Sequence, residues 1–315
     1  MSIRVANAPC SWGTIEGFAD NTPWDKMLDE LAGSGYVGTE LGDLGFMPTD
    51  PTVLRAELSH RSLVMLGGFQ GVPLRQPDAV PAWRERVLAV ARLLAAVADE
   101  DKAGRKPYFI LADETRGNGH RTARAGRITA ADGLDADEMR RFAANATLLA
   151  QLVLDETGLV TLFHHHCAAF IETPAEIERL LDATDPDLLG LVFDTGHYTY
   201  GTGVADPLGS HGKGTSALDG LRRFWGRVPY VHLKDCQPQV AARARELGWD
   251  YSTAVGAGVF CELGQGSVDL EGVLAFLQVQ GYRDWVTVEQ DVLPGMGTPR
   301  ESAARNRQTL ARLGL

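Results

Sequence analysis

The sequence predicts an α/β protein of the (β/α)8 TIM-barrel class. Eight short apolar runs rich in β-forming residues alternate with longer segments of helical periodicity along the 315 residues, as in a parallel barrel. Ionisable residues gather where the apolar runs end, and such barrels carry their chemistry at the carboxyl ends of the strands. A doubly wound sheet would instead place a glycine-rich dinucleotide turn after its first strand. The segment there, ANAPCSWG, does not match that turn, so the barrel is favoured.

The strands are expected in eight apolar segments bounded by turn-forming residues. In chain order these are IRVANAPCSW, YVGTELG, SLVMLGGF, PYFILAD, VTLFHHH, LLGLVFDTGH, YVHLKD and DWVTVEQD. The helices are expected at residues 22–35, 51–60, 80–99, 136–156, 174–183, 216–226, 269–281 and 301–313. In the first helix, Trp24, Met27, Leu28 and Leu31 recur on one face, which indicates that this face is buried.

Three helices begin with a threonine, a proline and an acid in the third position after the threonine. These are Thr22-Pro23-Trp24-Asp25, Thr173-Pro174-Ala175-Glu176 and Thr298-Pro299-Arg300-Glu301. The threonine can cap the helix while the acid reaches back to the cap, so we assign all three to structure.

Three polar stretches, at about 115–135, 200–216 and 236–266, are expected as loops over the active site of a single domain spanning 1–315. The segment GSHGKGTS in the second stretch is similar to a phosphate loop but lacks its residue order. We interpret it as a flexible loop that could close as a lid.

Composition and charge narrow the function classes. A chain with 44% hydrophobic residues can bury a sizeable core, and no apolar run is long enough to span a membrane. The start, MSIRVANAPCSWG, does not read as a signal peptide. The formal net charge of -11 disfavours nucleic-acid binding. The four cysteines, Cys10, Cys167, Cys236 and Cys261, form no C-x-x-C pair, which argues against structural zinc and for a reduced, cytoplasmic setting.

The strand ends suggest a metal centre. Ionisable residues at the expected ends are Glu40, Asp113, Glu114, His164, His165, His166, Asp194, His197, His232, Lys234, Asp235, Glu289 and Asp291. Because side chains two apart in a strand share a face, His164 and His166 should point one way and His165 the other. Inward histidines and carboxylates from separate strands can converge on one divalent cation, and a mixed N/O set suits Mn, Co, Zn, Fe or Mg. The histidines at 60, 120 and 211 lie in loops or at helix ends and are left outside the site.

The sequence resembles the xylose isomerase-like TIM-barrel superfamily of sugar isomerases and epimerases. The motifs that carry the resemblance lie between residues 5 and 292: NAPCSWG, GYVGTELGDLG, GRITAADGL, FHHHCAAFIETPAEIERLL, DTGHYTYGTG, VHLKD, AGVFCELGQGSVD and WVTVEQD. The order DTGH, HLKD, VEQD is specific for the superfamily. FHHH, TELG and the long stretch before residue 266 point to the inosose (2-keto-myo-inositol) dehydratase branch of inositol catabolism.

The resemblance implies one divalent metal ion, typically Mn or Co. By position, Asp194, His232 and Glu289 match metal ligands of the family, and His164 stands where the isomerases have a glutamate on strand five. Epimerases of this family use two metal-bound carboxylates as a symmetric acid–base pair, and the histidine removes one of them. This departure favours dehydration, which needs an unlike base and acid, and leaves open whether His164 itself ligates the metal or whether His166 or a water takes that place.

The sequence therefore predicts metal-assisted loss of water from a cyclic keto-polyol. We expect the metal to stabilise the enolate, with Glu289 or Glu40 removing the α-proton and Lys234 or His197 stabilising the enolate or protonating the departing hydroxyl. Trp12, Phe69, Gln70 and His166 are expected to contact the sugar ring. The expected partner is a small keto-polyol or sugar, with no nucleic acid and no membrane, and a homo-oligomeric state is left open.

Three other functions compete with this one. A metal-dependent isomerase or epimerase acting through an enediol would need nearly the same residues. A phosphodiesterase resembling the apurinic endonucleases of this barrel would need more inward histidines and a basic groove. A sugar-binding protein without catalysis would have little use for so many ionisable strand ends.

Overall fold

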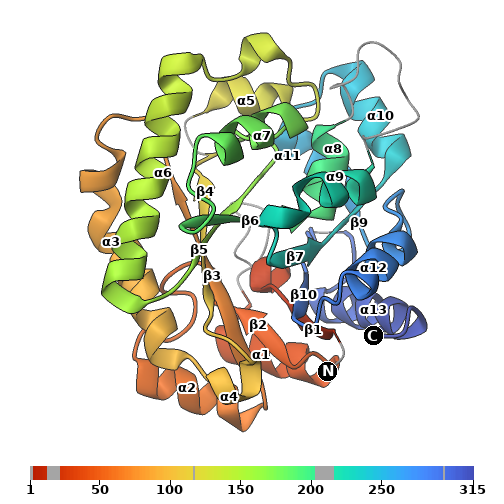
Figure 1. Cartoon of the computed structure of the whole chain (residues 1–315). Helices are drawn as coiled ribbons and strands as arrows, with labels where there is room; N and C mark the ends of the chain where they lie inside the picture. The colour runs from red at the N-terminus through yellow and green to blue at the C-terminus, as the bar shows by residue number, and fades with distance from the viewer. Residues whose placement is uncertain (1–2, 13–21, 116–117, 203–215, 294) are drawn as a thin grey trace.

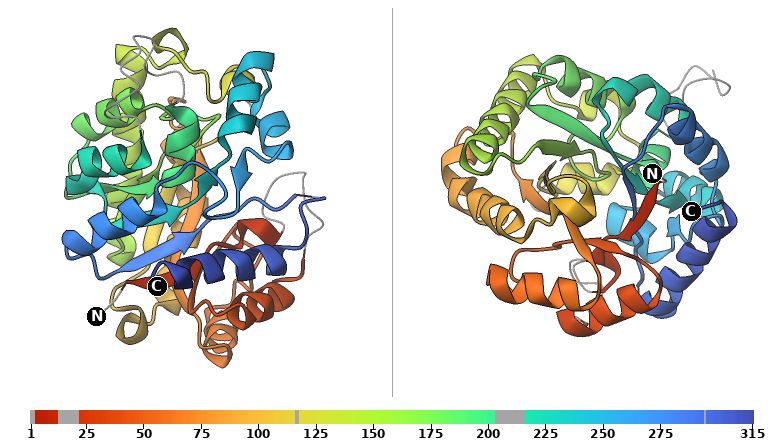
Figure 2. Two further views of the ribbon diagram at one scale, coloured as in Figure 1. Left: turned by 90° about the vertical axis from the view of Figure 1, so that its right-hand side faces the viewer. Right: turned by 60° about the horizontal axis from the view of Figure 1, so that its bottom comes forward.

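The computed structural model describes residues 3–12, 22–115, 118–202, 216–293 and 295–315. Within this part of the chain, eight parallel strands close into a barrel in the order β1-β10-β7-β6-β5-β4-β3-β2. Helices surround the strands as an outer ring (Figure 1 and the right-hand view of Figure 2). The predicted (β/α)8 class is therefore confirmed.

The barrel strands are short and almost fully buried. They are β1 (Arg4–Asn7), β2 (Gly38–Glu40), β3 (Val64–Val72), β4 (Tyr108–Asp113), β5 (Thr161–His164), β6 (Leu189–Asp194), β7 (Tyr230–Leu233) and β10 (Trp285–Val288). Closure comes from β1, which pairs with β10 on one side and with β2 on the other. The register between β6 and β7 sets Asp194 directly opposite His232. Two of the ionisable strand ends are thus neighbours by backbone pairing alone.

Eight helices lie where the sequence predicts them. These are α1 (Trp24–Gly33), α2 (Pro51–His60), α3 (Ala79–Val97), α6 (Ala136–Thr157), α7 (Pro174–Asp182), α9 (Ala217–Phe224), α12 (Leu270–Val279) and α13 (Pro299–Arg312). The apolar faces of these helices pack on the barrel, and in α1 the buried residues are Met27, Leu28 and Leu31. Among the described residues, no helix is both long and apolar enough to cross a membrane.

Two of the three predicted capping motifs form. Thr173 and Thr298 each accept a hydrogen bond from the backbone N–H of the acid three residues on, and both acids reach back to the cap. The prediction for Thr22 is wrong. Pro23 takes the N-cap position in an extended conformation, and no side chain caps the helix. Thr22 is therefore one residue too early to reach the free N–H groups.

Two expected strands end earlier than their sequences suggest. The first stops at Asn7, and the residues Pro9–Trp12 form a 3-10 turn, η1, because a proline has no N–H for the strand ladder. The sixth stops at Asp194, whose Oδ1 accepts from the His197 N–H at 2.7 Å. Asp194 thereby caps the short helix α8 (Thr195–Gly201), which takes the place of the end of the expected strand and the start of the stretch expected as a loop. The expected lid at 200–216, with His211, lies mostly outside the described residues.

The stretch 115–135 also contains unpredicted structure. Outside 116–117, it includes helix α5 (Gly119–Arg124) and the 3-10 turn η2 (Ala130–Asp132). Arg121 is buried and makes two hydrogen bonds to the carboxylate of Glu176 on α7. Two further short elements are α4 (Glu100–Ala103) and η3 (Trp225–Arg227).

The segment after β7 is a small folded unit, so its prediction as a loop over 236–266 is wrong. It contains β8 (Asp235–Cys236), α10 (Pro238–Leu247), α11 (Tyr251–Gly256) and β9 (Phe260–Cys261), with β8 and β9 antiparallel. Apolar side chains such as Ala244, Val255 and Phe260 give the unit a core of its own. Helix α11 packs against α5, at the same end of the barrel (Figure 1).

Asp235 ties this unit to the barrel. Its Oδ1 accepts from the N–H groups of Cys236 and Val268, and its Oδ2 accepts from those of Gly264 and Gly266. The carboxylate is fully buried, so these four bonds account for its role, and Asp235 is structural.

Asp235→Ala is expected to destabilise the protein by about 3 kcal/mol, because it leaves buried N–H groups without a hydrogen-bond acceptor. Thermal or urea unfolding measures this loss. Asp269→Ala, which removes an exposed cap from α12, serves as the control and should cost about 1 kcal/mol. Equal losses in the two variants would contradict the account of Asp235.

Candidate active site

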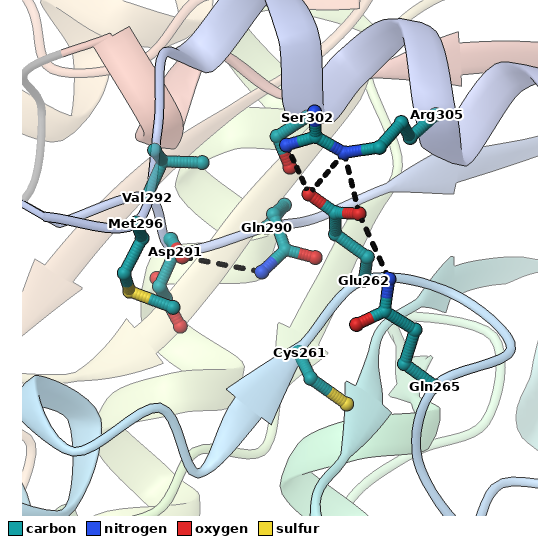
Figure 3. A pocket seen from close by; sticks show the side chains of 9 residues that line it. All are labelled: Cys261, Glu262, Gln265, Gln290, Asp291, Val292, Met296, Ser302 and Arg305. Atoms are coloured by element: carbon teal, nitrogen blue, oxygen red, sulfur yellow. Dashed lines mark hydrogen bonds and ion pairs between the residues drawn. The ribbon is translucent and has the colours of Figure 1, made fainter.

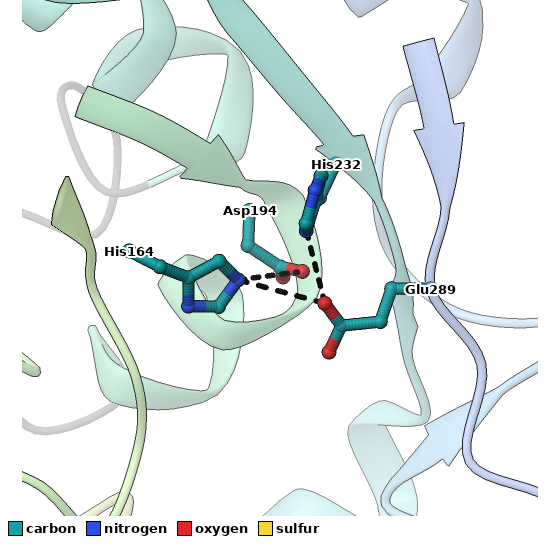
Figure 4. Close-up of side chains that lie close together, drawn as sticks. All are labelled: His164, Asp194, His232 and Glu289. Carbon is teal, nitrogen blue, oxygen red and sulfur yellow. Dashed lines mark hydrogen bonds and ion pairs between the residues drawn. The ribbon is translucent and has the colours of Figure 1, made fainter. Parts of the chain in front are cut away.

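Four side chains from four strands converge at one end of the barrel. His164 ends β5, Asp194 ends β6, His232 lies in β7, and Glu289 follows β10. Each offers one ligand atom, and these atoms all lie within 4.8 Å of one another. Figure 4 shows the four side chains pointing toward a common centre. They are the residues that the family resemblance implies as metal ligands.

The donor atoms of this cluster are suited to a cation. Glu289 Oε2 lies 2.9 Å from His232 Nδ1 and 3.5 Å from His164 Nε2, and His164 Nε2 lies 4.0 Å from Asp194 Oδ2. Both ring nitrogens of His164 and the Oδ2 of Asp194 are buried without a hydrogen-bond partner among the described residues. Buried polar atoms are costly to leave unpaired. Two imidazoles and two carboxylates form a donor set that a divalent transition metal accepts, so the residues fit a metal ion.

The charges of the cluster are strongly coupled. Burial raises the pKa of Asp194 to about 6, and the nearby charge of Glu289 adds to this. Burial would also raise the pKa of Glu289, but Lys234 and the surrounding histidines hold it well below its ordinary value. Burial would lower the pKa of His232, but Glu40 and Glu289 outweigh it and raise the value to about 10. The site thus keeps Glu289 as a charged carboxylate.

Lys234 fixes the outer oxygen of Glu289. Its Nζ lies 2.8 Å from Glu289 Oε1 and 2.9 Å from Asp291 Oδ2, and it sits 4.6 Å from the centre of the Phe260 ring. Burial would lower the pKa of Lys234, but Asp291 and Glu289 raise it well above its ordinary value. Lys234 therefore brings a permanent positive charge next to the cluster.

Glu40 lies behind His232 rather than beside a substrate. Its Oε1 accepts from His232 Nε2 at 2.8 Å and from the Tyr230 hydroxyl at 2.9 Å, while the other imidazole nitrogen, Nδ1, faces the cluster. A carboxylate on the far side of a ligating histidine fixes its tautomer and orientation. The position of Glu40 therefore favours a role in orienting His232 over the expected removal of the α-proton.

Glu40→Gln is expected to weaken binding of Mn by about 10- to 100-fold while the protein stays folded. Calorimetric titration of the metal-free protein measures the affinity. Glu57→Gln is the matched control. Glu57 lies on α2 and forms an ion pair with Arg61, and this variant should bind Mn normally. An unchanged affinity in Glu40→Gln would contradict the positioning role.

The three consecutive histidines have different surroundings. His164 points into the cluster. His165 points away from it, as predicted, toward Phe193 and Tyr198, and its Nε2 accepts from the Asp194 N–H at 3.1 Å. The strand ends at His164, yet His166 lies near the site, its ring 4.0 Å from that of His197.

Hydrogen bonds assign the tautomers of these two neighbours. His197 Nδ1 accepts from the Cys167 N–H at 3.4 Å, so the ring proton is on Nε2, which lies 3.6 Å from Glu289 Oε1. His166 Nδ1 donates to the Cys167 carbonyl, which leaves its Nε2 as an acceptor. Burial lowers the pKa of His166 to about 3 and that of His197 well below its ordinary value, so both rings are neutral.

Of the three predicted ring-contact residues on strands one and three, one faces the cluster. The Phe69 ring meets the His164 ring edge-on at 6.3 Å. Gln70, the next residue in β3, lies on the opposite face and accepts from Arg86 of α3 at 3.0 Å. Trp12 is fully buried, and its indole N–H donates to Glu30 of α1 at 2.8 Å. Gln70 and Trp12 are therefore engaged by helices, and Phe69 and His166 remain the expected substrate contacts.

A cavity of about 380 Å³ lies beside the site, and Asp291 belongs to both. Its lining includes Cys261, Gln290 and Ser302, and at its edge Glu262 pairs with Arg305 (Figure 3). The four clustered side chains do not line it. The cavity is thus separate from the candidate metal centre among the described residues.

The sequence analysis missed Tyr251. This residue begins α11, and its hydroxyl lies 3.5 Å from His166 Nε2. Burial and the nearby Asp291 raise the pKa of Tyr251 well above its ordinary value. Nothing in a segment interpreted as a loop marks this tyrosine, because only the fold of 236–266 brings it to the site.

Two named proteins are similar in sequence to nearly the whole chain. The inosose dehydratase of Geobacillus kaustophilus is 30% identical over 99% of this chain and 94% of its own length. The rhizopine catabolism protein MocC of Rhizobium meliloti is 31% identical over 99% of this chain and 89% of its length.

Solved structures share the fold. The IOLI protein, crystallised with a zinc atom, superposes with a TM-score of 0.65 at 16% identity, over 99% of this chain and 98% of that chain. The probable 3-DHS dehydratase AsbF of Bacillus anthracis gives 0.66 at 13% identity, over 98% and 99%. The model of the family described as xylose isomerase-like TIM barrel matches residues 28–313. With the closed barrel and the strand-end cluster, this match shows that the chain belongs to the xylose isomerase-like TIM-barrel family.

Proposed function

We propose that this protein is a divalent-metal-dependent dehydratase acting on a cyclic keto-polyol such as 2-keto-myo-inositol (inosose). The observation that carries the proposal is the four-residue cluster with His164 in the place of an isomerase glutamate. Full-length similarity to a protein named inosose dehydratase supports the substrate class.

The residues around the cluster supply the unlike acid and base that elimination requires. A divalent cation held by His164, Asp194, His232 and Glu289 would supply Lewis-acid stabilisation of negative charge on substrate oxygens. Mn and Co are the expected ions, with Zn, Fe and Mg as alternatives.

Glu289 is the proposed base for the α-proton. Its Oε1 faces away from the other three cluster residues, toward Lys234 and His197, and its depressed pKa keeps the carboxylate unprotonated. Lys234 stabilises the enolate oxygen by charge. His197 orients the substrate through its Nε2–H, and His166 and Phe69 contact the ring.

An isomerase or epimerase acting through an enediol is the second candidate. It is favoured by the structural similarity to L-ribulose 3-epimerase, with a TM-score of 0.65 at 15% identity. The symmetric pair of carboxylates that such an epimerase uses is absent from the four-residue cluster, which holds one carboxylate on β6 and one after β10 but a histidine on β5. This asymmetry supports the dehydratase.

The proposed partner is a small polar metabolite, without nucleic acid or membrane. The proposed location is the cytoplasm, as the cysteine content predicts. A homo-oligomer is compatible with this function, which needs a single barrel.

The experiment follows 2-keto-myo-inositol by NMR with metal-free protein and with the same protein reloaded with Mn. We expect a dehydrated diketone or its enol from the reloaded protein, and no product from the metal-free protein. A new epimer in place of the dehydrated product would support the second candidate instead. Equal turnover without metal would contradict the proposed metal dependence.

A further inference from the structure

The unit inserted after β7 brings a phenol beside His166, whose ring lies 5.9 Å from that of His164 in the metal cluster. Tyr251 is the first residue of α11, and Asp250 caps that helix by accepting from the Thr253 N–H at 2.8 Å. The Tyr251 ring meets His166 edge-on at 5.5 Å and Phe260 at 6.4 Å. The unit therefore holds this side chain from both its helix and its core.

Two proton donors near the cluster are weakly committed in the described chain. They are the Tyr251 hydroxyl and the His197 Nε2–H, which has no hydrogen-bond partner among the described residues but faces the proposed base, Glu289 Oε1, at 3.6 Å. Lys234 is held between Glu289 and Asp291 at 2.8 and 2.9 Å. His232 is held between Glu40 and Glu289 at 2.8 and 2.9 Å. The Tyr251 hydroxyl has a single long contact, 3.5 Å to His166 Nε2, and is half-buried.

The contact with His166 leaves the proton on the Tyr251 hydroxyl and allows this hydroxyl to turn toward a substrate. Because His166 Nδ1 donates to the Cys167 carbonyl, His166 Nε2 can only accept, so it orients the Tyr251 hydroxyl without competing as a donor. A contact of 3.5 Å is at the limit of a hydrogen bond, so little is lost when the hydroxyl turns to a substrate.

We propose that Tyr251 is a catalytic residue that protonates the hydroxyl group leaving the keto-polyol as water. This assignment rests on the proposed dehydratase function and names the acid that it requires. The inserted unit 235–261 would then decide that the enolate loses water rather than regaining a proton.

Glu289 takes the α-proton, and the electron pair of the C–H bond forms the enolate. Collapse of the enolate turns that pair into a Cα=Cβ double bond and breaks the C–O bond to the β-hydroxyl. The departing oxygen keeps the C–O electron pair and takes the Tyr251 proton to become water. Transfer of one proton from Glu289 to Tyr251 through solvent restores both residues.

Tyr251→Phe tests this assignment, because it removes only the hydroxyl. The matched control is Tyr200→Phe. Tyr200 lies in the same apolar cluster, and its hydroxyl has no hydrogen-bond partner among the described residues. Each Mn-loaded protein is incubated with 2-keto-myo-inositol in deuterated water, with a protein-free blank. Loss of water, deuterium entry into recovered substrate, metal content and melting temperature are measured.

We expect Tyr251→Phe to lose water about 10²- to 10⁴-fold more slowly, with wild-type metal content and melting temperature. Deuterium should still enter the recovered substrate, because Glu289 still removes the α-proton. Tyr200→Phe should behave as wild type in both reactions.

Water loss at the wild-type rate in Tyr251→Phe would overturn the assignment and leave the proposed function intact. An equal fall of exchange and water loss would also overturn it, because Tyr251 would then act before the hydroxyl leaves. A wild-type protein that neither exchanges nor dehydrates the substrate would overturn the proposed function, and this assignment with it.

Discussion

Asp194→Asn is expected to abolish both metal binding and turnover. The substitution removes one negative charge from the four-residue cluster but keeps a side-chain oxygen to cap α8 at the His197 N–H. We expect the affinity for Mn to fall by more than about 100-fold, since a lost ligand costs more than a lost supporting residue. Turnover should fall by about 10³-fold or more. Metal titration and product formation at fixed Mn measure the two effects.

Asp113→Asn is the matched control for this variant. Asp113 ends β4, is buried, and accepts from the Phe170 N–H at 3.0 Å. Burial raises the pKa of Asp113 to about 7, so a neutral side chain costs little there. Wild-type metal affinity in Asp194→Asn would contradict the assignment of the cluster.

Glu289→Gln is expected to reduce kcat by about 10²- to 10⁴-fold at saturating Mn. The amide has nearly the shape of the carboxylate but cannot accept the α-proton, and it leaves Lys234 paired with Asp291 alone. Exchange of the α-proton with deuterated water should be lost together with dehydration. This joint loss distinguishes the base from Tyr251, whose removal should leave the exchange intact.

Glu262→Gln provides the comparison for Glu289→Gln. Glu262 pairs with Arg305 at the neighbouring cavity. Among the described residues, it forms no ion pair with a residue of the cluster. Its replacement should leave kcat unchanged. Persistent exchange in Glu289→Gln would assign proton removal to another residue.

The sequence was sufficient for the barrel, because the barrel follows from regular geometry. Strand ends of a parallel barrel meet at one end, so the ionisable strand ends could be expected together, and the family resemblance singled out Asp194, His232 and Glu289 among them. The pairing of Asp194 with His232 across β6 and β7 shows the cause directly. Likewise, alternation placed His164 and His165 on opposite sides.

The alternation of side chains along a strand also argues against the expectation that both Phe69 and Gln70 contact the substrate ring. Consecutive residues of a strand face opposite sides, and Gln70 accordingly reaches Arg86 outside the barrel. Glu40 is different, because the register of β2 against β3 shifts between Thr39 and Glu40. Such an irregularity re-aims a side chain, and here Glu40 lies behind His232. A sequence pattern does not reveal that shift.

The roles of Tyr251 and Asp235 could not be predicted from the sequence. Both belong to the unit after β7, whose elements are too short to give a clear periodicity. Asp235 stabilises the unit through four backbone N–H groups that follow it by 1 to 33 residues. Such contacts form only in the folded chain. For the same reason, the contact between Tyr251 and His166 could be found only in the structure.

The most direct test of the central claim is mass spectrometry of 2-keto-myo-inositol incubated with the Mn-loaded protein in deuterated water. The dehydratase account predicts a product lighter by one water, formed by the wild type and not by Asp194→Asn. Product of unchanged composition apart from deuterium would contradict that account and identify an isomerase or epimerase.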